Sequence, residues 1–154
     1  MNLRKTAMIS VMAGVLAHAV TVRAEQINVG NEEFKRLLAQ GVPLVDVRTA
    51  GEWRQTGVVA GSRLITLFDE QGGSDPAGWV KEMDRVAGPG APVVIICRSG
   101  NRSGKAAQLL LQRDPKRKVY NVQEGIAGWA RAGQAVVSLQ ENLKQTGGAC
   151  SPRC

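Results

Sequence analysis

The chain has 154 residues, 44% of them hydrophobic and 21% charged, which is the composition of one globular domain rather than of a disordered or fibrous protein. Its formal net charge is +7, but its three tryptophans are scattered rather than interleaved with a basic stripe, which argues against a nucleic-acid partner. Its single histidine, His18, lies near the start, so the rest of the chain lacks the imidazole of a Ser-His or Cys-His catalytic pair and of most zinc sites.

Residues 1–24 have the layout of a secretory signal. Arg4 and Lys5 precede the apolar stretch TAMISVMAGVLAHAV, and the small-residue cleavage patterns AHA and VRA follow. The stretch is short and weakly apolar for a membrane span, although an uncleaved anchor and a domain helix remain alternatives. We expect a periplasmic or secreted protein with no stable membrane association after signal removal. Removal of the segment takes away Arg4, Lys5 and Arg23, so that 17 of the 20 basic residues remain with 13 acidic ones. The resulting net charge of +4 favours small anionic substrates.

From residue 25 onward, short apolar runs alternate with helical patterns. Asn31 is a candidate cap for the first helix, Thr49 and Glu52 fit a capping box, and Asp75 followed by Pro76 fits the start of a third helix. The expected elements in chain order are strand 26–30, helix 32–40, strand 42–48, a helix after 49, strand 62–67, helix 76–88, strand 92–97, helix 103–113, strand 118–122 and helix 125–133.

Five strands separated by helices predict an α/β domain over residues 25–137, with a parallel sheet covered on both faces. PVVIIC (92–97) is the most apolar strand and is therefore expected near the centre. In such sheets, ligands bind beyond the carboxyl ends of the strands, and Cys97 lies at such an end.

Residues 138–154 form a polar, glycine-containing tail that we expect to be loosely ordered. In an oxidising compartment, Cys150 and Cys154 are expected to pair with each other or with a partner protein. A redox relay between these cysteines and Cys97 is a further alternative.

The segment VVIICRSGNRS (93–103) places a cysteine where a buried strand opens into a loop rich in hydrogen-bond donors. Gly100 permits positive φ, so that successive amides converge into an anion-binding nest, and the following helix adds its dipole. Together with the charges of Arg98 and Arg102, these features favour a thiolate and predict that Cys97 is a nucleophile activated without a base. The alternative is a buried cysteine that only packs in the core.

Three segments in order resemble the rhodanese-like sulfurtransferases. PVVIICRSGNRS is similar to the family's active-site loop, VPLVDVRTAGEW to its Asp-x-Arg-x-x-x-Glu-[Trp/Tyr] segment, and VYNVQEGIAGWARAGQAV to its closing Gly-Gly-x-x-x-Trp-x-x-x-Gly segment. The chain departs from the pattern in lacking the usual histidine in TGVVAGS and in having Glu124 where the first glycine of the pair is expected.

The resemblance implies a three-layer α/β/α sandwich on a five-stranded parallel sheet, with Cys97 accepting a sulfane sulfur as a persulfide. It implies a small anionic donor such as thiosulfate, a thiol or cyanide-like acceptor, and no metal or cofactor. Arg98 and Arg102 would orient the donor. The loop residues expected to cradle the sulfur are Arg98, Ser99, Gly100, Asn101, Arg102 and Ser103.

Two other functions stay open. Phosphatases and arsenate reductases of the same fold use a Cys-x5-Arg loop, but here only four residues separate Cys97 from Arg102 and the loop holds no carboxylate that could serve as general acid. A non-catalytic binding or sulfur-sensing module is the second alternative. Asp46, Arg48 and Glu52 could line the pocket, but we expect them to form an ion-paired network and a helix cap. Trp53 and Trp129 are expected to be core or packing residues rather than substrate platforms.

Overall fold

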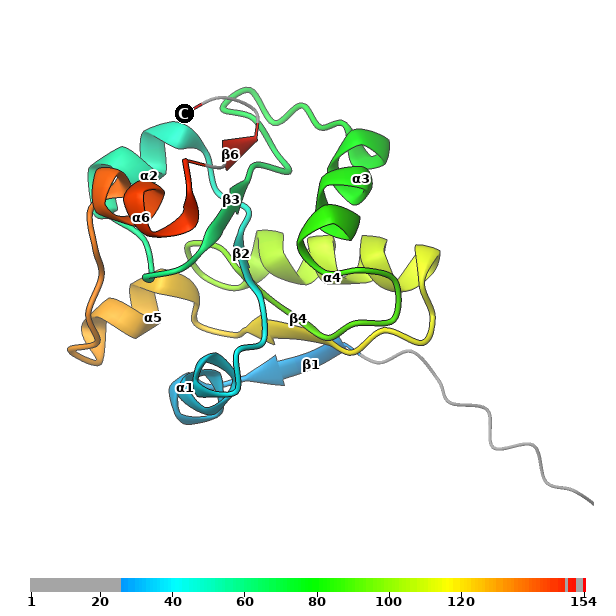
Figure 1. Cartoon of the computed structure of the whole chain (residues 1–154), viewed down its shortest axis with the longest axis horizontal. Coiled ribbons are helices and arrows are strands. Elements are labelled where there is room, and N and C mark those ends of the chain that lie inside the picture. Colours follow the sequence, from blue (N-terminus) through cyan, green and yellow to red (C-terminus); the bar gives the residue numbers. More distant parts are fainter. Residues whose placement is uncertain (1–25, 149, 152–153) are drawn as a thin grey trace, which may run out of the picture.

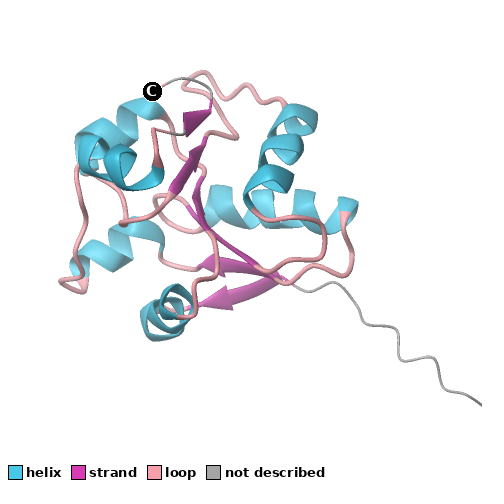
Figure 2. Cartoon of the chain, in the orientation of Figure 1, coloured by secondary structure: helices cyan, strands magenta, loops and turns pink. Residues whose placement is uncertain are grey.

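The computed structural model describes residues 26–148, 150–151 and 154, and the predicted signal segment 1–24 lies outside them. The described strands are β1 (Gln26–Val29), β2 (Leu44–Asp46), β3 (Arg63–Ile65), β4 (Val93–Ile96), β5 (Val119–Val122) and β6 (Cys150–Ser151) (Figures 1 and 2). The described helices are α1 (Asn31–Ala39), α2 (Ala50–Thr56), α3 (Pro76–Val86), α4 (Asn101–Arg113), α5 (Gly125–Arg131) and α6 (Leu139–Thr146). Among these helices, none is both long and apolar enough to cross a membrane.

The described strands form one sheet in the order β1-β5-β4-β2-β3-β6, with each neighbouring pair parallel. β4 lies between β5 and β2, which confirms its predicted central place. Because parallel strands end at the same edge of a sheet, Cys97 follows β4 at the edge where such folds bind ligands.

Alternating side chains of β4 divide the core into two layers. Val93 and Ile95 pack with side chains of α3 and α4, whereas Val94 and Ile96 pack with side chains of α1 and α5. Figure 1 shows α3 and α4 on one side of the sheet and α1, α2, α5 and α6 on the other. The predicted three-layer α/β/α arrangement is therefore confirmed.

The five predicted strands are all present, and the structure adds a sixth, whereas the expectation of a loosely ordered tail is wrong. Within 138–154, α6 and the two-residue β6 are formed, and β6 adds a sixth strand beside β3. Trp53, Leu64 and Leu139 share a buried cluster that the tail closes over, so tertiary packing orders a segment of polar composition. Cys150 and Cys154 form a disulfide, which confirms the first of the pairings considered.

Local signals at the helix starts are mostly confirmed. The Thr49–Glu52 capping box is present, and the Asp75 side chain accepts a hydrogen bond from the amide of Gly78 with Pro76 at the helix start. Asn31, however, lies inside α1, whose cap is the preceding glycine, and its Nδ2 donates to the carbonyl of Gly128 at 3.4 Å.

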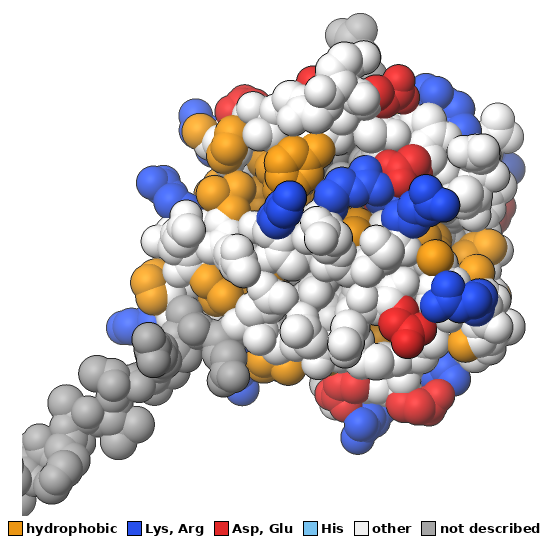
Figure 3. Space-filling view, turned by 180° about the vertical axis from the view of Figure 1, so that it is seen from behind, with side chains coloured by type: hydrophobic (Ala, Val, Ile, Leu, Met, Phe, Trp, Pro, Cys, Tyr) orange, Lys and Arg blue, Asp and Glu red, His pale blue; other side chains and the backbone are white. Residues whose placement is uncertain are grey.

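Figure 3 shows how charged side chains are arranged on one face of the molecule. On the face opposite to that of Figure 1, Lys and Arg side chains lie among acidic and hydrophobic ones (Figure 3).

Candidate active site

Cys97 is the residue on which the site is built. It follows β4 directly and is only 1% exposed. Its Sγ accepts a hydrogen bond from the amide of Gly100 at 3.2 Å, and the Ser103 Oγ lies 3.3 Å away. The sulfur is therefore held by polar groups of its own loop, even though the rest of the residue belongs to the apolar layer beneath α3 and α4.

Two glycines allow the loop to take this shape. Gly100 has φ of 86°, which confirms the predicted left-handed conformation, and it caps α4, which begins at Asn101, two residues before the predicted start. Gly125 has φ of 58°, and a Cβ there would collide with the carbonyl of Cys97. The amide of Ile126 donates to that carbonyl at 2.9 Å, so the first turn of α5 clamps the cysteine loop from the side.

The charged residues near the loop are largely neutralised in pairs. Arg102 binds Glu52 through two contacts, Nη1 to Oε2 at 2.7 Å and Nη2 to Oε1 at 2.5 Å. Arg48, buried beside Asp46, binds it at 2.7 Å. These pairs confirm the predicted ion-paired network. Arg98 is exposed and has no carboxylate partner among the described residues, so it is the free cation of the loop.

The Glu52–Arg102 pair has an electrostatic consequence for both partners. Burial by itself raises the pKa of Glu52, but hydrogen bonds from Arg102 and from the Thr49 amide hold it below its usual 4.5. The hydrogen bond to Glu52 raises the pKa of Arg102, and the nearby Cys97 and Asp46 act in the same direction. The pair thus links the start of α2 to the first turn of α4 and keeps a positive charge near the sulfur.

A cavity of about 420 Å³ opens beside the loop. Arg98, the residue directly after Cys97, lines this cavity with its free positive charge. The cavity has one charged and polar wall and one apolar wall from α5; its lining residues are Arg48, Glu52, Gln55, Thr56, Arg98, Ile126, Ala127 and Ala130.

The predicted loop residues take different places. Gly100 and Ser103 contact the sulfur, whereas the Arg102 side chain binds Glu52. Ser99 and Asn101 are exposed. Because Arg102 is held by Glu52, Arg98 is the arginine left free to meet an anion.

Sequence reasoning missed Asn121, whose side chain is buried next to Ser103. The Ser103 Oγ lies 2.6 Å from the Asn121 Oδ1, and Asn121 is 5% exposed. A polar residue inside the apolar strand KVYNV is the signal that could have identified it, because a buried amide is costly unless it is hydrogen-bonded.

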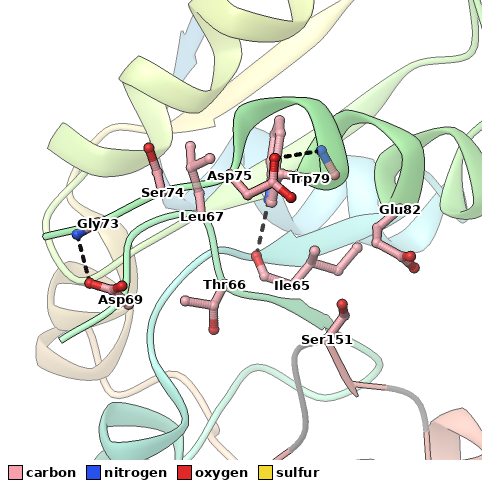
Figure 4. Close-up of a pocket in the computed structure, with 11 residues that line it drawn as sticks. Ile65, Thr66, Leu67, Asp69, Gly73, Ser74, Asp75, Trp79, Glu82 and Ser151 are labelled. Carbon is pink, nitrogen blue, oxygen red and sulfur yellow. Dashed lines mark hydrogen bonds between the residues drawn. The ribbon is translucent and has the colours of Figure 1, made fainter. Parts of the chain in front are cut away.

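A larger cavity of about 660 Å³ lies elsewhere, between β3, α3 and Ser151 (Figure 4). Two of its carboxylates bond to the local backbone: Asp69 accepts from the amide of Gly73 at 2.6 Å, and Asp75 caps α3. The third, Glu82, pairs with Arg85. None of the predicted site residues lines it. Within the described ranges, no three His, Cys, Asp or Glu side chains are placed to hold a metal ion.

Comparisons with known proteins agree with this geometry. Residues 30–132 match the family described as Rhodanese-like domain. The Zea mays protein named adenylyltransferase and sulfurtransferase MOCS3-2 is 30% identical over 130 residues, which cover 82% of this chain and 25% of that protein. Thiosulfate sulfurtransferase 18 of Arabidopsis thaliana is 29% identical over 113 residues, which cover 71% of this chain and 82% of that protein.

Among solved structures, the thiosulfate sulfurtransferase from Pseudomonas aeruginosa is similar with a TM-score of 0.59 and 23% identity. The match covers 73% of this chain and 20% of that one, and at this identity it shows the fold alone. The chain also spans only 25% of the length of each maize relative that it matches.

Proposed function

This chain belongs to the rhodanese-like domain family, and on that premise we propose that it is a sulfurtransferase that carries a sulfane sulfur on Cys97. The observation that carries the proposal is the position of the Cys97 Sγ, 3.2 Å from the amide of Gly100 at the carboxyl edge of the sheet. A sulfur with only a packing role has no need of a loop amide held there by a left-handed glycine and clamped by α5.

In the first half-reaction, the Cys97 thiolate attacks the outer sulfur of thiosulfate. A new sulfur–sulfur bond forms to Cys97, the sulfur–sulfur bond of thiosulfate breaks, and its electron pair leaves with sulfite. The negative charge then sits on the terminal sulfur of the persulfide, where amides of the loop and the first turn of α4 stabilise it. This assignment needs neither a metal nor an imidazole.

In the second half-reaction, a nucleophilic acceptor attacks the terminal sulfur. Cyanide gives thiocyanate and a thiolate gives an organic persulfide; in each case the electron pair of the breaking bond returns to Cys97. Arg98 attracts the anionic reactants because its charge is unpaired beside the cavity. We propose thiosulfate as donor from this anion-attracting entrance and from the name of the Arabidopsis relative.

Turnover of thiosulfate with cyanide, read as thiocyanate formation, tests this function. We expect activity in the wild-type protein, none in Cys97→Ser, and a raised KM for thiosulfate in Arg98→Gln. Lys116→Gln, which removes an exposed cation beyond the far end of α4, is the matched control and is expected to behave as wild type. Hydrolysis of para-nitrophenyl phosphate without thiocyanate formation would instead establish a phosphatase, and a stable persulfide without turnover a sulfur-sensing module.

We also propose that residues 1–24 direct export, so that the domain works in the periplasm or outside the cell. The Cys150–Cys154 disulfide supports this, because such bonds persist mainly in oxidising compartments. The mass of the protein recovered from the periplasm of a bacterial host tests the proposal. A chain beginning at Val20 or Glu25 is expected, whereas a full-length chain that stays in the cytoplasm contradicts export.

A further inference from the structure

A chain of polar side chains leads from Cys97 to the surface, and its first two members, Ser103 and Asn121, are buried. The Ser103 Oγ lies 3.3 Å from the Cys97 Sγ and 2.6 Å from the Asn121 Oδ1. The Asn121 Nδ2 donates in turn to the Asn28 Oδ1 at 2.9 Å, and Gln26 Nε2 donates to the same oxygen at 2.9 Å. Ser103 is fully buried, so its hydroxyl depends on these two partners.

The Asn121 amide is oriented by its two partners. Its Nδ2 donates to the Asn28 Oδ1, and its Oδ1 faces the Ser103 hydroxyl and accepts from it. A hydroxyl has one proton to donate. The Asn121 oxygen and the Cys97 sulfur therefore compete for the proton of Ser103, and at 2.6 Å the Asn121 oxygen holds the shorter contact.

We propose that Asn121 is a positioning residue that decides whether the Ser103 hydroxyl accepts a hydrogen bond from the Cys97 thiol or donates one to the Cys97 sulfur anion. While Ser103 donates to Asn121, its oxygen has a lone pair free for the thiol S–H. When the thiol proton passes to water, the Ser103 hydroxyl turns and donates to the sulfur instead. Ser103 keeps its own proton throughout and only exchanges one acceptor for another.

The consequence is that Asn121 restrains the reactivity of Cys97 in the resting protein. Forming the anion requires the hydrogen bond between Ser103 and Asn121 to break, and that bond offsets part of the gain from the new bond to sulfur. After sulfur transfer, the anion is on the persulfide, and release of the same hydroxyl from Asn121 would help to hold it. The inference rests on the proposed function only in taking Cys97 as the reacting group.

Alkylation of Cys97 by iodoacetamide at neutral pH, followed by intact mass, tests this inference without any sulfur donor. Cys97 is the free cysteine, since the other two of the sequence are joined in a disulfide. We expect Asn121→Leu to alkylate about threefold to tenfold faster than wild type, because Ser103 then donates to the sulfur without competition. Thiolate absorbance in the ultraviolet should rise in parallel. Asn121→Ala gives the same test if the leucine variant does not fold.

A double-mutant cycle separates this role from a merely structural one. In a Ser103→Ala background, Asn121→Leu should leave the alkylation rate unchanged, because no hydroxyl remains to be redirected. Asn142→Leu is the matched control. Asn142 is also fully buried and donates to the carbonyl of Ser62, and its replacement should leave the alkylation rate of Cys97 unchanged. The inference is overturned if Asn121→Leu does not raise the alkylation rate of the otherwise wild-type protein. It is also overturned if Asn121→Leu raises that rate in the Ser103→Ala background. Failure of sulfur transfer in the wild-type protein would overturn the proposed function but not this result.

Discussion

The backbone at Gly100 determines where the Cys97 sulfur meets its hydrogen-bond donor. Its φ of 86° lies in the left-handed region, and a Cβ at this position would run into the carbonyl of Gln123. The conformation turns the Gly100 amide toward Cys97 at 3.2 Å. A single backbone angle therefore links the strand-to-helix turn to the chemistry.

Replacing Gly100 with alanine should harm both stability and persulfide formation. We expect a loss of about 1–3 kcal/mol in the free energy of unfolding from backbone strain, measured by urea denaturation, and a persulfide yield reduced about tenfold or more. Gly88→Ala is the control, because its Cβ would meet nothing within 4 Å and its φ is not in the left-handed region. Equal behaviour of the two variants would refute the role given to Gly100.

Glu52 makes a pH-dependent contribution that can be measured directly. Its pKa is below 4.5 in the folded protein because Arg102 and the Thr49 amide outweigh the effect of burial. The stabilisation is therefore fully present above pH 4.5, the ordinary value, and is lost as pH falls below it through the lower folded-state pKa.

We expect Glu52→Gln to lower the free energy of unfolding by about 1 kcal/mol at neutral pH. The difference from wild type should shrink as the pH falls below the ordinary glutamate value. Glu32→Gln, in an exposed pair with Lys35, should show little difference at any pH. A Glu52→Gln deficit that stays constant into acid would show that the charge of Glu52 is not its source.

At the scale of elements, the sequence predicts where helices begin but not which distant side chains come into contact. The capping box of α2 and the proline at the start of α3 lie within a few residues of the helix ends they define, so spacing alone predicts them. Arg102 binds Glu52, which lies 50 residues away in the sequence, and Ser103 contacts Asn121, which lies 18 residues away. These contacts form because the parallel sheet places β4 between β2 and β5, so that the ends of the three strands lie side by side.

The sequence does not predict α6, because the apolar face of this helix is narrow. Leu139 and Asn142 are the buried residues of this helix, too few to produce a clear periodic pattern. The helix is ordered because Leu139 packs against Trp53 and Leu64 and removes their apolar surface from water. Its stability therefore comes from tertiary packing, which a single sequence does not display.

Leu139→Ala tests whether the tail is an integral part of the fold. We expect a loss of about 2 kcal/mol in the free energy of unfolding, because a buried leucine is removed from the cluster around Trp53. Val136→Ala, at a side chain that is 39% exposed, should change the free energy by less than about 0.5 kcal/mol. A destabilisation no larger than that of the control would mean that the tail merely rests on the domain.

At the scale of the whole molecule, Cys97 and the disulfide occupy separate parts of one sheet. β2 and β3 lie between β4, which leads to Cys97, and β6, which carries Cys150. The disulfide packs with the cluster around Trp53, and Arg54 of α2 holds the carbonyl of Cys154 at 2.8 Å. This arrangement favours a stabilising role for the disulfide over a redox relay.

We therefore expect the double variant Cys150→Ser with Cys154→Ser to form the Cys97 persulfide within about twofold of the wild-type rate, since distant sites act independently. Its free energy of unfolding should fall by about 1–2 kcal/mol, because a short loop is no longer closed in the unfolded chain. Loss of the persulfide in a variant that remains folded would instead establish the relay between the tail and Cys97.

The intact mass of the protein after incubation with thiosulfate tests the central claim most directly. The account predicts a gain of one sulfur atom in the wild-type protein, its removal by cyanide, and no gain in Cys97→Ser. A wild-type protein that gains no sulfur, or a Cys97→Ser variant that gains as much as the wild type, would contradict it.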